Sequence, residues 1–141
     1  MELRAAPRIG EHALELAANS RIKQVVEVLD ERAREARLPQ LLAKYHASRK
    51  NRVIVFALYK KEAARVEQDV QRAGYSCIAI HGDMTQEQRT RNLAQFKDGS
   101  VPLLVATDVA ARGLHIESLR HVVNWDFGTN LPQYVHRVGR T

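Results

Sequence analysis

Two stretches in the last third of the chain combine small, hydroxyl, acidic and basic residues directly after apolar runs. They are Ala106–Ile116, which reads ATDVAARGLHI, and His136–Thr141, which reads HRVGRT. In an open α/β sheet the ligand-binding loops follow the carboxyl ends of the strands. Thr107 offers a hydroxyl and the following backbone N–H groups to a phosphate, and the planar guanidinium of Arg140 suits phosphate oxygens. We therefore expect phosphate chemistry at these two stretches.

The remaining parts of a phosphoryl-transfer site are missing from the sequence. Such catalysis needs a phosphate cradle, an acidic group that holds a metal, a positioned water and a cation for the transition-state charge. The chain contains no G-x-x-x-x-G-K-[ST] loop, and no acidic pair follows a strand in the way a metal-holding pair would. We expect these parts to come from another domain.

The residues around both stretches predict a layered α/β fold. Short apolar runs alternate with helical patterns, as in a parallel sheet with helices on both faces. Lys61–Ala73 carries an apolar stripe and ends at Gly74, a typical residue just beyond a helix. Thr85 and Gln88 have the capping-box spacing that opens a helix, and Gly99 closes it. The predicted strands are Val53–Phe56, Cys77–Ile80, Leu103–Ala106 and His121–Trp125.

Composition limits the class of protein. The chain has 141 residues and 45% hydrophobic content, enough for one domain with its own core. Its 22 basic and 16 acidic residues give a net charge of +6, which suits a nucleic acid partner but also an ordinary solvated surface. The single cysteine, Cys77, excludes an internal disulfide and is predicted to be a buried strand residue. No stretch approaches the roughly 18 apolar residues of a membrane span, and no signal peptide is visible, so we expect an intracellular protein, cytoplasmic or nuclear, without membrane binding.

The two phosphate-binding stretches resemble motifs V and VI of the DEAD-box RNA helicases. Val53–Phe56 resembles motif IV, Gln86-x-x-Arg89 resembles the QxxR element of the family, and Val123–Asp126 resembles the segment between motifs V and VI. The matches lie in family order from about Ile22 to Thr141. The chain is therefore similar to the C-terminal RecA-like domain of such a helicase.

This resemblance implies an α/β, RecA-like fold with a mostly parallel sheet and helices on both faces. It makes residues 1–18 an approach from the inter-domain linker and residues 19–141 the helicase C-terminal domain, which is C-terminally truncated inside motif VI. It also bears on Ile22–Tyr45, where periodicity permits one long helix but β-branched residues and the N-cap residue Asp30 permit a strand and a helix. The resemblance favours a strand at about Arg21–Val28 and a helix from about Glu31 to Tyr45.

The resemblance also implies roles on the ATP side. Arg140 would be an arginine finger on the γ-phosphate, with His136 and Arg137 coupling the ATP and RNA sites. The alternatives are a surface or ion-paired role for Arg140 and a helix-face structural role for His136. Gly113 and His115 would lie in the ATP site, although the family usually has Asp where this chain has His115. Arg112 would contact acidic groups of the N-terminal helicase domain.

On the RNA side the resemblance assigns Thr107, Gln86 and Arg89 to the phosphate backbone, and Gly82 and Asp83 to a backbone approach to RNA. Gln86 and Arg89 lie three apart on one helix, so both could face one ligand, but an exposed solubilising pair remains open. His81 and Asp83 could suggest a metal, yet no third ligand follows at metal spacing, and we predict none.

One further position fits the family pattern and two depart from it. Phe56 is the motif IV aromatic, and we expect it to be buried against motif VI. Tyr59 stands where the family usually has a small hydroxyl residue after motif IV, and this departure would weaken the contact with RNA phosphate. Gly128 replaces a usual proline.

The implied function is the C-terminal half of an ATP-dependent RNA helicase, an RNA-stimulated ATPase as the full-length protein. ATP and Mg²⁺ would be bound mainly by the N-terminal RecA-like domain, and the partners would be that domain and single-stranded or short duplex RNA. The isolated chain is expected to be inactive. Two alternatives remain: an RNA clamp or scaffold without turnover, and a DNA-directed superfamily 2 helicase domain, which generally carries Gln in place of His136.

Overall fold

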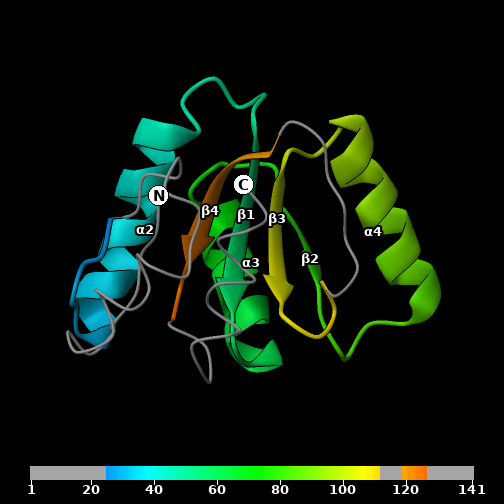
Figure 1. Ribbon diagram of the computed structural model, residues 1–141, viewed down its shortest axis with the longest axis horizontal. Helices are drawn as coiled ribbons and strands as arrows, with labels where there is room; N and C mark the ends of the chain where they lie inside the picture. The colour runs from blue at the N-terminus through cyan, green and yellow to red at the C-terminus, as the bar shows by residue number, and fades with distance from the viewer. Residues whose placement is uncertain (1–24, 112–118, 127–141) are drawn as a thin grey trace, which may run out of the picture.

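A four-stranded parallel sheet forms the centre of the molecule (Figure 1). The structure is a computed structural model and describes residues 25–111 and 119–126. The strands follow the order β2-β3-β1-β4, and each neighbouring pair is parallel. In chain order the elements are α2 (Glu31–Tyr45), β1 (Arg52–Ala57), α3 (Lys60–Arg72), β2 (Ile78–Ile80), α4 (Gln86–Asp98), β3 (Leu103–Thr107) and β4 (Leu119–Asn124).

Helices cover both faces of this sheet, as predicted. Alternate residues of a strand point to opposite faces, and β1 is apolar on both: Val53 and Val55 face one cluster, whereas Ile54 and Phe56 face the other. The first cluster packs against α2 and α3, and the second against Phe96 of α4. Strands buried on both faces are continuous apolar runs rather than alternating ones, as three of the four predicted strands are; the fourth, His121–Trp125, also contains polar residues.

The helix ends were predicted well from local residues. Asp30 caps α2 by accepting a hydrogen bond from the N–H of Ala33 at 2.7 Å. Thr85 and Gln88 form the predicted capping box of α4. Gly74 beyond α3 and Gly99 beyond α4 have φ values of +95° and +83°, the left-handed conformation that favours glycine.

The predicted strand at Arg21–Val28 is wrong for the part that the structure describes. Residues 25–30 form neither strand nor helix. A strand needs a ladder of backbone hydrogen bonds, and β4, at the end of the described sheet, pairs with β1 only. Instead, Glu27 forms an ion pair with Arg37 of α2 at 3.0 Å, and Val28 is 62% exposed. The β-branched residues here favour an extended chain but do not create a pairing partner.

His46, at the carboxyl end of α2, is a polar residue in the interior. It is 1% exposed and its ring centroid lies 5.8 Å from that of Tyr75. Burial lowers the pKa of His46 below its usual value, because the imidazolium would lose its hydration. This packing therefore favours the neutral ring.

Cys77 is buried as predicted, although it lies one residue before β2 rather than within it. Burial and the nearby Glu67 carboxylate raise the pKa of its thiol, which keeps it protonated. Within the described part of the chain, no helix combines the length and apolar character needed to cross a membrane. The predicted boundary between residues 18 and 19 lies outside the described residues and stays a prediction.

Candidate nucleic-acid interface

The candidate site lies at the carboxyl edge of the sheet. Because all pairings are parallel, the strands end at the same edge, where the arrowheads of β3 and β4 point in Figure 1. Every described residue that we predicted to contact RNA lies in a segment that starts from this edge. These segments are the turn after β2, the start of α4 and the end of β3.

Thr107 is the last residue of β3 and pairs with Ala57 of β1. Its carbonyl accepts a hydrogen bond from the N–H of Ala111 at 3.0 Å, which turns the chain back at the strand end. Thr107 is only 7% exposed, so little of its side chain reaches the surface. A ligand at this position would meet mainly the backbone of the turn that follows.

Gln86 and Arg89 lie together on the first turns of α4. Arg89 Nη2 donates a hydrogen bond to Gln86 Oε1 at 3.1 Å, and Gln86 Nε2 donates to Thr90 Oγ1 at 3.3 Å. Arg89 is half-buried, and its Nε has no hydrogen-bond partner among the described residues. The structure therefore confirms that both side chains share one face of the helix, next to the positive end of the helix dipole.

The turn after β2 is held by its own polar groups. His81 Nδ1 accepts a hydrogen bond from the N–H of Asp83 at 3.3 Å. Gly82 is exposed, and a Cβ atom placed on it would meet nothing within 4 Å. Packing inside the described chain therefore does not require glycine here. Among residues 25–111 and 119–126, no group of three His, Cys, Asp or Glu side chains is arranged to hold a metal ion.

Lys60 is a residue of this edge that the sequence analysis missed. Its Nζ lies 2.8 Å from Asp83 Oδ1, and both side chains are more than half exposed. This hydrogen bond and charge lower the pKa of Asp83 below its usual value. Lys60 follows β1 and Asp83 follows β2, so the ion pair joins segments on either side of β3. The available signal was the pair of basic residues Lys60 and Lys61 shortly after the predicted strand Val53–Phe56.

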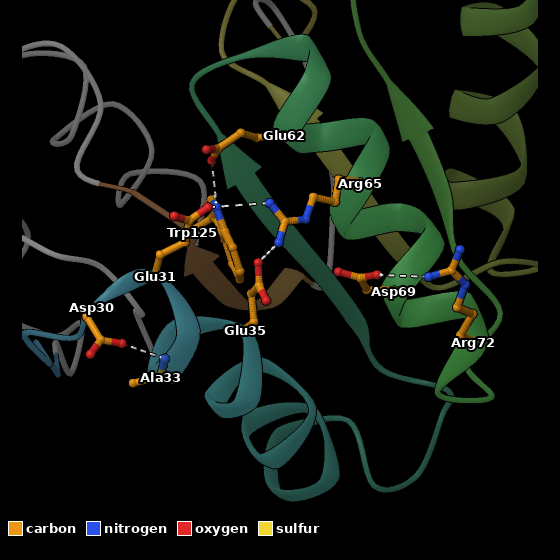
Figure 2. Close-up of polar contacts among 9 residues, drawn as sticks. All are labelled: Asp30, Glu31, Ala33, Glu35, Glu62, Arg65, Asp69, Arg72 and Trp125. Carbon is orange, nitrogen blue, oxygen red and sulfur yellow. Dashed lines mark hydrogen bonds and ion pairs between the residues drawn. The ribbon is translucent and has the colours of Figure 1, made fainter.

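The residues that follow β4 contact α2, α3 and the first residue after β1. Trp125 Nε1 donates a hydrogen bond to Glu62 Oε2 of α3 at 2.7 Å (Figure 2). Arg34 of α2 donates to the Trp125 carbonyl at 3.2 Å, and its guanidinium lies 4.6 Å from the indole ring. Asp126 Oδ2 accepts a hydrogen bond from the N–H of Leu58, just beyond β1, at 2.6 Å.

Figure 2 also shows ion pairs that join α2 to α3 beside this tryptophan. Arg65 of α3 pairs with Glu31 at 3.4 Å and with Glu35, both on α2. These side chains are partly exposed, so each pair adds little stability by itself. Together with the Trp125 contacts, they set how α2 and α3 lie at the end of β4.

Six predicted site residues lie outside the described part of the chain: Arg112, Gly113, His115, His136, Arg137 and Arg140. Gly128 also lies outside it. Phe56 is 2% exposed in the cluster beneath α4, which confirms its predicted burial, whereas the motif VI residues predicted to cover it are not described. The ATP-side roles therefore stay predictions.

Comparison with known proteins defines first the class and then the family. One similar solved structure is that of the Escherichia coli DEAD-box protein SrmB bound to regulator of ribonuclease activity A. The alignment covers 79% of this chain and 64% of the SrmB chain, with a TM-score of 0.71 and 34% identity. Another is Saccharomyces cerevisiae Dbp5 bound to RNA and ADP BeF3. Here the alignment covers 76% of this chain and 29% of the Dbp5 chain, with a TM-score of 0.65 and 30% identity. The fold is therefore that of the RecA-like domains of DEAD-box proteins, as predicted.

The family follows from the sequence matches. The helicase conserved C-terminal domain matches residues 33–141. DEAD-box ATP-dependent RNA helicase 5 of Arabidopsis thaliana is 57% identical over 129 residues, which are 92% of this chain and 24% of that protein. This chain belongs to the helicase C-terminal domain family and, within it, to the DEAD-box RNA helicases. It spans about a quarter of the length of that relative.

Proposed function

We propose that this chain is the C-terminal half of an ATP-dependent RNA helicase and that its carboxyl edge binds the RNA phosphate backbone. The observation that carries the proposal is the placement of the five predicted RNA contacts at one edge of the parallel sheet: Gln86, Arg89, Gly82, Asp83 and Thr107. The membership of the chain in the DEAD-box family supports it. So does the Dbp5 structure, which contains RNA and ADP BeF3.

The chemistry of this edge suits a polyanion. Arg89 carries five N–H donors, of which one bonds to Gln86, and it lies at the amino end of α4. Anions are stabilised at helix amino ends by the dipole and by free backbone N–H groups. The open backbone at Gly82 lets a phosphate approach closely. Contacts of this kind fix the position of a strand without reading its bases.

The proposal extends to catalysis in the longer protein. Arg140 would act as an arginine finger across the cleft, with His136 and Arg137 beside it and with Gly113 and His115 near the nucleotide. ATP and Mg²⁺ would be held mainly by an N-terminal RecA-like domain, which Arg112 would contact in the closed state. The chain alone would therefore hydrolyse no ATP.

The test compares two arginines on the same helix. Arg89→Ala should weaken binding of labelled single-stranded RNA in fluorescence anisotropy, to a similar extent for unrelated sequences, and should lower the salt slope by about one unit. Arg91→Ala is the matched control, because Arg91 is exposed two positions further along α4 and points to another side of the helix.

Equal losses for Arg89→Ala and Arg91→Ala would contradict the proposal, since they would reflect net charge alone. A change in preference between two RNA sequences upon Arg89→Ala would contradict the backbone role. Circular dichroism of both variants shows whether the fold is retained.

A further inference from the structure

Two exposed apolar side chains follow strands that end at the same edge. The large hydrophobic residues that are exposed in the described chain are Val28, Tyr59 and Val109, and the last two are 65% and 73% exposed. Tyr59 comes two residues after β1 and Val109 two residues after β3. Single exposed apolar residues are common, but here two of three follow adjacent central strands.

The strand register pairs the strand ends that lead to these two positions. β1 and β3 are neighbours, and Ala57 pairs with Thr107 at their carboxyl ends. Adjacent strands lie about 4.8 Å apart. Tyr59 and Val109 therefore each come two residues after this pair, which includes the predicted phosphate contact Thr107. Figure 1 shows β1 and β3 side by side in the middle of the sheet.

The local structure gives no reason for a tyrosine at position 59. Tyr59 is the N-cap residue of α3, yet its side chain makes no capping hydrogen bond with the helix. Ser, Thr, Asp and Asn are the residues that stabilise a helix at this position. Because the ring is mostly exposed, it also contributes little to the core.

The charges around Tyr59 fit a nucleic acid. Lys60 and Lys61 follow it directly and are both exposed. Of the carboxylates near this position, Asp83 is paired with Lys60 at 2.8 Å, and Asp126 accepts a hydrogen bond from the N–H of Leu58. Aromatic rings beside cationic side chains are how proteins bind single strands, because each base presents a face on which a ring can stack. Phosphate contacts alone would leave the bases untouched.

We propose that Tyr59, flanked by Val109, is a stacking platform for a base of single-stranded RNA that lies along the carboxyl edge of the sheet. This inference rests on the proposed RNA-binding function and adds a base contact to it. The contact tolerates any base, since stacking does not depend on hydrogen-bond readout.

The experiment uses the 141-residue chain and two RNA strands of equal length, one ordinary and one abasic. Tyr59→Ala should weaken binding of the ordinary strand by about fivefold or more and leave binding of the abasic strand unchanged. Tyr59→Phe should bind both strands like the original chain, because the ring is retained. Val28→Ala, which changes an exposed apolar residue in the segment before α2, serves as the control and should have no effect.

Arg89→Ala separates the two proposals, because it should weaken binding of both strands. If Tyr59→Ala binds ordinary RNA as well as the original chain while Arg89→Ala binds it more weakly, the stacking platform is wrong and the backbone site stands. If Tyr59→Phe loses as much as Tyr59→Ala, the contact is a hydrogen bond of the phenol and stacking is refuted. If the original chain binds neither strand, the proposed function fails and the inference falls with it.

Discussion

Removing the carboxylate of Glu62 should destabilise the domain, because Trp125 would lose its hydrogen-bond acceptor. Trp125 is 4% exposed, and its indole N–H donates to Glu62 Oε2 at 2.7 Å. Hydrogen bonds to charged groups contribute about 1.5–3 kcal/mol, and a buried donor left without a partner costs about 1–3 kcal/mol. We therefore expect Glu62→Ala to lower the free energy of unfolding by about 2 kcal/mol. Glu62→Gln, which keeps an acceptor oxygen, should lose less.

Urea unfolding followed by circular dichroism measures this difference in free energy. Trp125→Phe removes the donor and provides the second arm of a double-mutant cycle. In the Trp125→Phe background, Glu62→Ala should cost much less than in the original chain. The reasoning would be refuted by a loss below about 0.5 kcal/mol in the original chain, or by equal losses in the two backgrounds.

Three other perturbations test separate parts of the molecule. The pKa of His46 is lowered in the folded state, so the unfolded state binds the proton more readily. The free energy of unfolding should therefore fall as the pH drops below about 6.5. His46→Gln should reduce this pH dependence, as measured by thermal unfolding. In a longer protein with both helicase domains, Arg140→Lys should lower kcat far more than it lowers ATP affinity, by about 10³-fold if Arg140 is an arginine finger. A loss of kcat below about tenfold in a steady-state ATPase assay would show that Arg140 is not an arginine finger. In the same longer protein, His115→Asp should tighten ATP binding by about tenfold and should remove the loss of ATP affinity between pH 7.5 and pH 6. If the original protein and the variant bind ATP equally at both pH values, His115 is not in the ribose site.

Sequence reasoning predicted the architecture because the signals for it are local. The four apolar runs became the four strands with small shifts at their ends, since each run is buried on both faces. The caps at Asp30 and Thr85 and the glycine after α3 act within one helical turn, so nearby residues suffice to predict them. The strand expected at Arg21–Val28 failed where it could be checked, because pairing depends on a distant partner.

The candidate site was predictable only in part for the same reason. The contact between Gln86 and Arg89 follows from helical spacing and could be predicted. The ion pair between Lys60 and Asp83 joins residues 23 positions apart, and it depends on β3 lying between β1 and β2. Likewise, Trp125 bonds to Glu62 from 63 positions away. Contacts of this kind need the strand order, which periodicity does not contain.

The same strand order has a consequence for how the chain is made. Both neighbours of β1 come later in the sequence: β3 begins at Leu103 and β4 at Leu119, whereas β1 ends at Ala57. Synthesis at about 5–20 residues per second leaves β1 without its first partner for about 2–9 seconds. During this time the segment Arg52–Ala57, which reads RVIVFA, is a short apolar stretch of high β-propensity, the type of segment that aggregates when it is unpaired. Chains interrupted before Leu103 should therefore be recovered in aggregates, and the nascent domain should depend on chaperones until β3 has emerged.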